Sequence, residues 1–470
     1  MRFGVGLRPE LWAAILEHAA TIDVVEVMVD DLLHLSPRRA ARELAPLRHA
    51  GLDLVVHGVG LSLASVDGPR PRYLRKVSKL LDALKVQVYS EHCSFHRLGS
   101  RSVGQFMPVP FTESWAERVA TNVKRVQQAT GRRLLIENIA YVTESPHQGL
   151  GEAGFYRAVC ELADCGLLLD LENVCVNAAN LAYDALDLVA ALPLDQVGQL
   201  HLAGGHVGPD GIRVDSHSAP VSADVYALLQ AVAPRLPDNC HLIIERDKGF
   251  PGSWAPLERD LDASRDCIAT GDSTTLQGRR FRAGEERRAD DVSARQLQEA
   301  WIDYFQMDRD RRPQPYVAAV PERFRAAFGS VLRTKRRDKL KPLLPGTWRY
   351  LVAHELLDDT LRRWFTAQPD QSLSRAAEVM GFANLVQASA DIPEAIQALA
   401  RHEATLVELK SKPYRRWPHR WLPQRREIVS SFSGRALDEA SRGGELPEAL
   451  TRSARTRYTR RAKGVWVQDL

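Results

Sequence analysis

The chain has 470 residues, 44% of them hydrophobic, and its 63 basic and 59 acidic residues leave a formal net charge of +4. This length predicts two domains with sizeable cores. Because the basic and acidic residues nearly balance, the net charge does not point to a class of binding partner for the chain as a whole. No apolar stretch approaches the roughly 20 residues that cross a bilayer, and the N-terminus lacks the pattern of a signal peptide, so we expect a cytoplasmic protein without a membrane anchor.

Eight short apolar runs occupy the first 250 residues or so. They are continuous rather than alternating, as parallel strands are when helices cover them. The runs are residues 3–7, 23–29, 52–58, 86–92, 133–138, 166–173, 197–203 and 241–247. Segments of helical composition separate them, at 9–20, 71–85, 113–130, 154–164 and 222–234. The pattern predicts an α/β fold, a closed (β/α)₈ TIM barrel, over residues 1–270.

Six of these runs end in, or next to, a side chain that can bind a metal ion. The residues are His57, His92, Glu137, Asp170, His201 and Glu245. A (β/α)₈ barrel brings the C-terminal ends of its strands to one face, so these side chains should converge there. Histidine and carboxylate ligands without cysteine favour iron, manganese or zinc, and their number exceeds what one ion needs. The sequence therefore predicts more than one metal ion.

Three further residues are candidate ligands. Asp215 and His217 lie two apart, so in an extended segment both side chains project to the same side. Glu172 follows Asp170 by two residues and can join the set by the same argument, although less certainly. Glu137 lies at the centre of the set and is the natural carboxylate to bridge two metals about 3.5–4 Å apart.

Structural roles are the alternative for each candidate. A single histidine at a strand end, such as His92, is more often a hydrogen-bonded core residue than a ligand. Arg246 or Lys248 could form a salt bridge with Glu245, whereas Glu137 and Asp170 have no adjacent cation in the sequence. Six such residues in succession favour coordination. We expect structural roles for His96, His147, His206 and His241, free thiols for all six cysteines, and packing roles for Cys93 and Cys175.

Beyond the barrel, the composition changes twice. Residues 271–291 are polar and charge-dense, as in a linker, and residues 292–410 show apolar positions at helical spacing, which predicts a second, mainly α-helical domain. Residues 411–470 carry 14 Lys or Arg against 6 Asp or Glu, with interspersed aromatic residues. We interpret this basic tail as a solvated, partly disordered extension, and contact with nucleic acid or an acidic peptide is the less favoured interpretation.

Eight segments of the first 270 residues carry a resemblance to a known family. They are GVGLR (4–8), VVHGVGLSL (55–63), SEHCSF (90–95), LLIENI (134–139), LLLDLENVCVNAANLAYD (167–184), QLHLAGGH (199–206), VDSHSAPV (214–221) and IIERD (243–247). In content and order they resemble the multinuclear non-heme iron-dependent oxidases that modify ribosomally made peptides. The resemblance implies a TIM barrel that holds two or three iron ions and acts with O₂ on a cysteine of a precursor peptide. It places metal ligands at His57, His92, Glu137, Asp170, His201, Asp215, His217 and Glu245.

The chain departs from the family pattern in three places. Where the family usually has Asp-x-Asn-Asn, residues 170–173 read Asp-Leu-Glu-Asn, so Glu172 puts a carboxylate where an amide is usual. The first acidic motif reads Glu26-Val-Met-Val-Asp30-Asp31, and an extra glycine in residues 202–206 displaces His206. The first departure puts the third metal site in doubt. The type of cysteine modification, among oxazolone with thioamide, heterocycle or loss of Cβ, is not predicted.

Enzymes of this family usually work with a separate partner protein that binds the leader part of the precursor. Residues 392–410 are similar to such a partner, which suggests that the partner is fused in this chain as residues 292–410. The alternative is a helical domain that serves only dimerisation or stability, and the oligomeric state is not predicted.

Two other function classes remain open. The enzymatic alternative is a zinc- or manganese-dependent isomerase or phosphodiesterase of the xylose-isomerase type. The sequence offers neither a strand-end lysine for sugar isomerisation nor a basic cluster in the barrel loops for a DNA backbone. The other alternative is a non-catalytic peptide- or nucleic-acid-binding protein, against which the intact ligand set argues.

Overall fold

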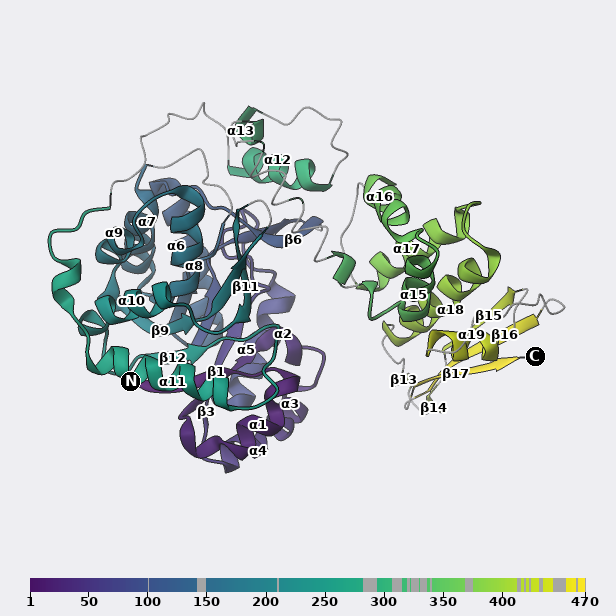
Figure 1. Ribbon diagram of the computed structural model, residues 1–470, viewed down its shortest axis with the longest axis horizontal. Helices are drawn as coiled ribbons and strands as arrows, with labels where there is room; N and C mark the ends of the chain where they lie inside the picture. The colour runs from purple at the N-terminus through teal and green to yellow at the C-terminus, as the bar shows by residue number, and fades with distance from the viewer. Residues whose placement is uncertain are drawn as a thin grey trace. The chain divides into compact units, whose positions relative to one another are not determined.

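A computed structural model of the protein describes most of the chain (Figure 1). The described residues are 1–99, 101–141, 149–208, 211–281, 294–306, 315–318, 322, 329, 336–338, 340–367, 375–411, 416–417, 420–421, 424–430, 434–442, 454–461 and 464–469. The chain divides into two compact units. The first comprises Met1–Gly99, Gln105–Trp301 and Pro313–Ala327, and the second comprises Ser100–Gly104, Ile302–Arg312 and Phe328–Leu470.

Eight parallel strands of the first unit close into a barrel in the order β1-β12-β9-β8-β7-β4-β3-β2, which confirms the predicted TIM barrel. Their bounds are β1 Arg2–Gly6, β2 Val24–Met28, β3 Asp53–Gly58, β4 Tyr89–His92, β7 Leu134–Glu137, β8 Gly166–Asp170, β9 Val197–Leu202 and β12 His241–Ile244. Each strand coincides with one of the eight predicted runs. Continuous burial, as in β7 and β8, is what helices around a parallel barrel impose.

Helices surround the barrel, as the ribbon shows (Figure 1). They are α1 Trp12–Glu17, α2 Val29–Leu32, α3 Pro37–Glu43, α4 Ala45–His49, α5 Pro71–Leu84, α6 Glu113–Thr130, α7 Gly151–Ala163, α8 Leu171–Leu181, α9 Ala185–Ala191, α10 Ala223–Val232 and α11 Ala255–Ala269. Local signals explain their ends. Thr112 caps α6 by accepting the Trp115 N–H, and Gly131 ends that helix at a φ of 65°, a backbone conformation that glycine adopts without strain.

Two antiparallel hairpins interrupt the barrel pattern, and the sequence did not predict them. The first, β5 (Phe95–Leu98) with β6 (Arg101–Met107), lies between β4 and α6. The second, β10 (Gly204–Val207) with β11 (Arg213–Ala219), lies between β9 and α10. Both therefore begin at the C-terminal ends of barrel strands, the face on which the candidate ligands gather.

Helix α12 (Ala294–Gln306) contributes its first half to the first unit. The side chain of Gln298 is buried, and it forms two hydrogen bonds with the backbone of the loop after β3. Its amide donates to the Ala64 carbonyl at 2.7 Å and accepts the Val66 N–H at 3.0 Å. The Ala64 N–H in turn donates to the carbonyl of Ser94, two residues beyond His92. A helix that follows the barrel in sequence thus supports the loop after β3, next to the segment that carries His92.

Replacing Gln298 by alanine should destabilise the first unit. The substitution leaves the buried Ala64 carbonyl without its partner, at an expected cost of about 1–3 kcal/mol. Differential scanning calorimetry should show a lower Tm for the unit. Arg295→Ala is the matched control, because the Arg295–Asp67 pair is solvent-exposed and such pairs contribute under about 1 kcal/mol. Equal effects of the two substitutions would contradict a supporting role for Gln298.

The second unit is mainly helical, as predicted for this region, and it also contains strands. Its elements include α15 Pro345–Ala353, α16 Leu357–Ala367, α17 Arg375–Ala388, α18 Glu394–Ser411 and α19 Gly434–Ser441. Trp364 and Phe382 meet edge to face in its core, with ring centroids 5.5 Å apart. The buried carboxylate of Glu403 accepts the N–H groups of Gly346 and Thr347 at the start of α15, a favourable position for an anion.

The basic tail forms a three-stranded antiparallel sheet, where the sequence suggested a partly disordered extension. Its strands are β15 (Gln424–Ser430), β16 (Ala454–Arg461) and β17 (Gly464–Asp469), and the pairs β13 (Arg416–Trp417) and β14 (Arg420–Trp421) form a smaller sheet. β-branched and aromatic residues, which strands favour, recur in both β16 and β17. In the described part of the chain, no helix combines the length and the apolar character needed to cross a membrane.

Candidate metal centre

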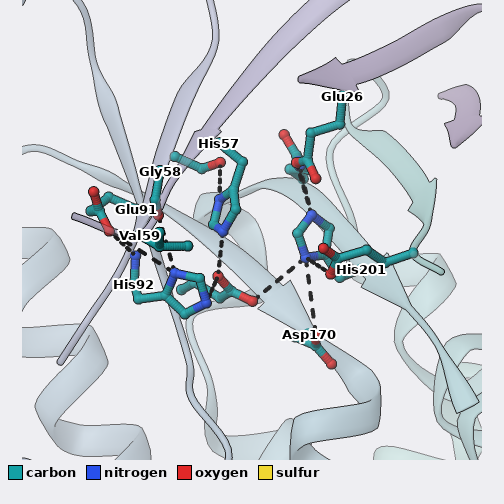
Figure 2. A network of polar contacts seen from close by, with 12 residues as sticks. Glu26, His57, Gly58, Val59, Glu91, His92, Asp170 and His201 are labelled. Atoms are coloured by element: carbon teal, nitrogen blue, oxygen red, sulfur yellow. Dashed lines mark hydrogen bonds and ion pairs between the residues drawn. The ribbon is translucent and has the colours of Figure 1, made fainter. Parts of the chain in front are cut away.

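Four histidines and several carboxylates meet at the C-terminal end of the barrel. Figure 2 shows His57 and His92 from neighbouring strands with His201 nearby, between Glu26 and Asp170. Among the described residues, the side chains form four overlapping groups of three possible ligands. They are His57, His92 and Glu137; Glu26, His201 and Glu245; Glu137, Asp170 and His201; and Asp170, His217 and Glu245.

The first group joins strands β3, β4 and β7. The Nε2 atoms of His57 and His92 each lie 3.2 Å from Oε2 of Glu137. On its far side, Nδ1 of His92 lies 3.1 Å from the Gly58 carbonyl, and Nδ1 of His57 lies 2.8 Å from Oγ of Ser90. Because a carbonyl only accepts, Nδ1 of His92 donates to Gly58, and Nε2 is the ring nitrogen that faces Glu137. Such a partner fixes the orientation of a metal-binding imidazole.

His201, on β9, faces carboxylates on both sides. Its Nδ1 lies 3.2 Å from Oε2 of Glu245, 3.5 Å from Oε1 of Glu137 and 4.0 Å from Oδ2 of Asp170. Its Nε2 lies 2.9 Å from Oε2 of Glu26. Glu137 therefore presents one oxygen to His57 and His92 and the other to His201. A carboxylate in this position can be shared by two ions.

The third part of the centre comes from the second hairpin. On β11, Nε2 of His217 lies 2.7 Å from Oδ1 of Asp215 and 3.7 Å from Oδ2 of Asp170. Its Nδ1 lies 3.1 Å from Oε2 of Glu245, the oxygen that also faces His201. Asp215 is in none of the four groups among the described residues, so the expectation that it and His217 bind one ion stays a prediction. His217 has a φ of 45°, a strained conformation for a non-glycine residue and one that is enriched at functional sites.

Glu172 lies apart from these groups. The predicted run 166–173 is too long at its C-terminal end, because β8 stops at Asp170 and α8 begins at the next residue. Asp170 initiates that helix by accepting the Asn173 N–H at 2.7 Å. Glu172 is thus in the first helical turn, so the argument from an extended segment was wrong. Its carboxylate pairs with Arg213 at 2.9 Å instead.

Two residues of the site were not among the predicted ligands. Arg8, just after β1, donates to Oε1 of Glu245 at 2.8 Å, and it is the cation for which the sequence suggested Arg246 or Lys248. Arg246 pairs with Asp260 at 3.5 Å. Glu26 is fully buried within β2. The sequence contains a signal for Glu26, because it is a charged residue inside an apolar run. For Arg8 the only signal is its position just after a predicted strand.

Burial and mutual attraction perturb the pKa values of the whole cluster. Burial alone raises the pKa of Glu137, but the attraction of His92 and His57 brings it below its ordinary value. Burial also tends to raise the pKa of Glu245. The attraction of His201 and His217 is stronger and holds that pKa well below its ordinary value.

At Asp170, burial prevails and raises the pKa well above the ordinary value, against the opposing attraction of His217. For His201, the carboxylates of Glu26 and Glu245 overcome burial and raise the pKa well above normal. So dense a set of perturbed groups in one place is typical of a functional site.

The donor set fits metal ions. Within the described residues, several buried atoms that face one another have no partner with hydrogen-bond geometry. They are Oε2 of Glu137, Oδ2 of Asp170, Nδ1 of His201 and both ring nitrogens of His217. Leaving such atoms unsatisfied is costly, and an ion between them would satisfy several at once. Imidazole with carboxylate and no thiolate suits iron, manganese or zinc.

The residues expected to be structural fall outside the four groups. His206 and His241 are in none of them, and His147 lies outside the described residues. Cys93, Cys160, Cys165, Cys175 and Cys240 are buried free thiols, and Cys267 is a half-buried free thiol, which agrees with the expectation from sequence.

His96 should make the first unit sensitive to acid. Burial, with Arg97 next to it, lowers the pKa of His96 to about 3. Because this value lies below the ordinary one, the stability that neutral His96 provides is complete above about pH 6.5 and is lost as the pH falls.

Relative to a His96→Gln variant, the wild type should lose up to about 1.4 kcal/mol per pH unit below that point. Unfolding both metal-free proteins at pH 7.5 and at pH 5.5 measures the difference, since the other titrating groups cancel. A difference that is the same at both pH values would contradict the prediction.

Comparisons with known protein families and relatives agree with the resemblance in sequence. Residues 2–269 match the family described as RiPP precursor modification enzyme MbnB/TglH/ChrH. A UPF0276 protein of Acaryochloris marina (strain MBIC 11017) is 36% identical over 248 residues, which cover 53% of this chain and 88% of that protein. A UPF0276 protein of Nitrosospira multiformis is 35% identical over 268 residues, which cover 55% of this chain and 89% of that protein.

Solved structures are more distant. The D-psicose 3-epimerase of Clostridium cellulolyticum with D-tagatose has a TM-score of 0.40 at 12% identity, covering 58% of this chain and 99% of its own. Endonuclease IV of Thermus thermophilus has a TM-score of 0.38 at 20% identity, covering 57% of this chain and 99% of its own. At these scores, neither structure supports an inference about the chemistry.

Proposed function

The chain belongs to the MbnB/TglH/ChrH family of RiPP precursor modification enzymes, and on that basis we propose that it is an O₂-dependent iron oxidase. Its proposed substrate is a cysteine of a ribosomally made precursor peptide, and its proposed cofactor is two or three iron ions. The observation that carries the proposal is the position of Glu137, whose two oxygens face two different sets of histidines. In a site for one ion, the two oxygens of a carboxylate would not be expected to face separate sets of ligands.

Three sets of residues would hold the ions. His57 and His92 would hold the first, His201 the second, and Asp215 with His217 the third. Glu137 would be shared by the first two sets, and Asp170 and Glu245 by the last two, because each lies near both His201 and His217. Bound iron would supply the redox chemistry and the affinity for a substrate thiolate that these side chains lack.

The surrounding residues would control access and charge. The side chains of His57 and Glu137 are only 2% exposed, so that part of the centre is shielded from water. Asp215 and Asp247 are 36% and 42% exposed, so the peptide would enter on the His217 side. Arg8 would balance part of the negative charge of Glu245 and Asp247.

Metal analysis together with turnover tests this function. The protein is purified without oxygen, loaded with iron-57, and examined by elemental analysis and Mössbauer spectroscopy. It is then mixed with a cysteine-containing peptide encoded next to its gene, with and without O₂. We expect two or three irons per chain, some of them exchange-coupled, and an O₂-dependent mass change that a Cys→Ser peptide lacks. Stoichiometric zinc or manganese with negligible iron would favour the isomerase or phosphodiesterase alternative.

We also propose that the second unit binds the precursor peptide, as a fused partner would. The support is the similarity of residues 392–410 to such partners, a segment that lies in helix α18. Fusion would raise the local concentration of the barrel around a bound peptide. A chain that ends at Ala327, which keeps the Gln298 contacts and every residue of the first unit, should bind and modify the peptide more weakly than the full chain. Equal binding and turnover would refute the proposal.

A further inference from the structure

Glu172 contacts both strands of the hairpin that carries Asp215 and His217. On β11, Arg213 donates from Nη2 to Oε2 of Glu172 at 2.9 Å and from Nε to Oε1 at 3.3 Å. On β10, the N–H of Gly205 donates to Oε1 at 3.1 Å. The Glu172 side chain is fully buried, so these contacts form away from water. Both oxygens of the carboxylate are therefore occupied by the hairpin.

The backbone of the hairpin creates the need for this acceptor. The β10–β11 register shifts between Gly204 and His206, which takes Gly205 out of the regular pairing. Its N–H would lack a ladder partner, and Glu172 accepts it instead. A Cβ atom at position 205 would lie 2.7 Å from Oε1 of Glu172 and 2.5 Å from the Val214 carbonyl. Only a glycine permits so close an approach.

Helix α8 holds the same point of β11 by a second pair of contacts. Asn180 accepts the Arg213 N–H at 2.9 Å and donates to the Arg213 carbonyl at 2.9 Å. The backbone and the side chain of Arg213 are thus both fixed to α8. Asp215 follows two residues later on the same strand and His217 four residues later. Their positions beside Asp170 depend on where α8 holds Arg213.

We infer that Glu172 is a positioning residue that anchors the β10–β11 hairpin, and that it is not a metal ligand. The inference rests on the proposed function in taking the centre to bind metal. The Glu172 carboxylate belongs to none of the four ligand groups among the described residues, and any shift toward the centre would lengthen its bonds to the Arg213 guanidinium and the Gly205 N–H. Glu172 and Arg213 therefore act as a pair, and through it α8 sets the geometry of Asp215 and His217.

Metal content distinguishes an anchor from a ligand. Full-length chains with Glu172→Ala or Arg213→Ala are loaded anaerobically with iron(II), and iron per chain is measured. If Glu172 is an anchor, both variants should lose about one iron equivalent relative to the wild type. If it is a ligand, Arg213→Ala should keep the full content while Glu172→Ala loses one, and that result would overturn the inference. Asp224→Asn is the control, because Asp224 contacts Arg213 from an exposed position and should lose none.

Hydrogen exchange on the metal-free full chain tests the anchor without reference to metal binding. In both alanine variants, amides of β10 and β11 should exchange at least tenfold faster, while those of β9 remain unchanged. Glu172→Gln keeps an acceptor for the Gly205 N–H, so the increase in its exchange rates should be smaller. This variant keeps the test valid if the alanine variants unfold as a whole. Unchanged exchange in β10 and β11 in all three variants would overturn the inference. If the wild type binds no iron but the variants still show faster exchange in β10 and β11, the proposed function is refuted and the anchor stands.

Discussion

A Glu137→Gln variant should lose more than half of its bound iron and nearly all of its activity. The two carboxylate oxygens of Glu137 face different histidines, at 3.2 Å from His57 and His92 and at 3.5 Å from His201. Glutamine has only one acceptor oxygen and no charge, and its NH₂ group would point at one of the two ligand sets. Loss of a residue that only supports a ligand typically costs 10–100-fold in metal affinity or activity, so removal of a shared ligand should cost more than about 100-fold.

Elemental analysis and peptide turnover measure this loss on the same sample. Glu152→Gln is the matched control, because Glu152 is also a buried glutamate of the barrel and belongs to none of the four ligand groups among the described residues. We expect its iron content to match that of the wild type. An E137Q protein with full iron content would mean that the ions are held without a shared carboxylate, and it would refute the proposed arrangement.

Removal of the metal should lower the Tm of the first unit by more than about 8 °C and leave the second unit unchanged. Without ions, the carboxylates and imidazoles of the centre remain buried with unsatisfied atoms. Each ion present at about 1,000 times its Kd contributes about 4 kcal/mol, and for a domain of this size 1 kcal/mol corresponds to about 2–4 °C. Calorimetry of the iron-loaded and chelator-treated full chain gives the difference.

The E137Q variant provides the control for that experiment. Because it should bind little iron, chelation should shift its Tm by only a small fraction of the wild-type shift. A similar shift in both proteins would show that the chelator acts elsewhere than on this centre. No shift in the wild type would contradict a structural contribution of the ions.

The sequence predicted the barrel and the convergence of the strand-end residues because both follow from local pattern. His57, Glu137 and Asp170 lie at or next to the ends of parallel strands, and closure of a parallel barrel determines where such ends meet. Contacts across the barrel are different. Glu26 on β2 meets His201 on β9 only because the sheet closes between them, and no local signal connects the two residues.

The sequence failed where a strand changes directly into another element. Leu171 and Glu172 continue an apolar run that reads equally well as a strand, but Asp170 accepts the Asn173 N–H and turns the chain into a helix. Aspartate is among the residues preferred at the position just before a helix, so the signal was present in the sequence and was outweighed. The hairpins and the tail sheet escaped because strands such as β11 and β16 are mostly polar and lack the continuous apolar run that marks the barrel strands.

Two residues of the proposed third set, Asp215 and His217, lie on a hairpin and not on a barrel strand. Residues 204–219 can therefore change in length or sequence during evolution without breaking a hydrogen bond of the closed barrel. The inner ligands on β3, β4 and β7 have no such freedom, since a shift of one residue there would turn every neighbouring side chain to the opposite face. New chemistry in descendants of this fold should accordingly arise first from exchange of this one hairpin.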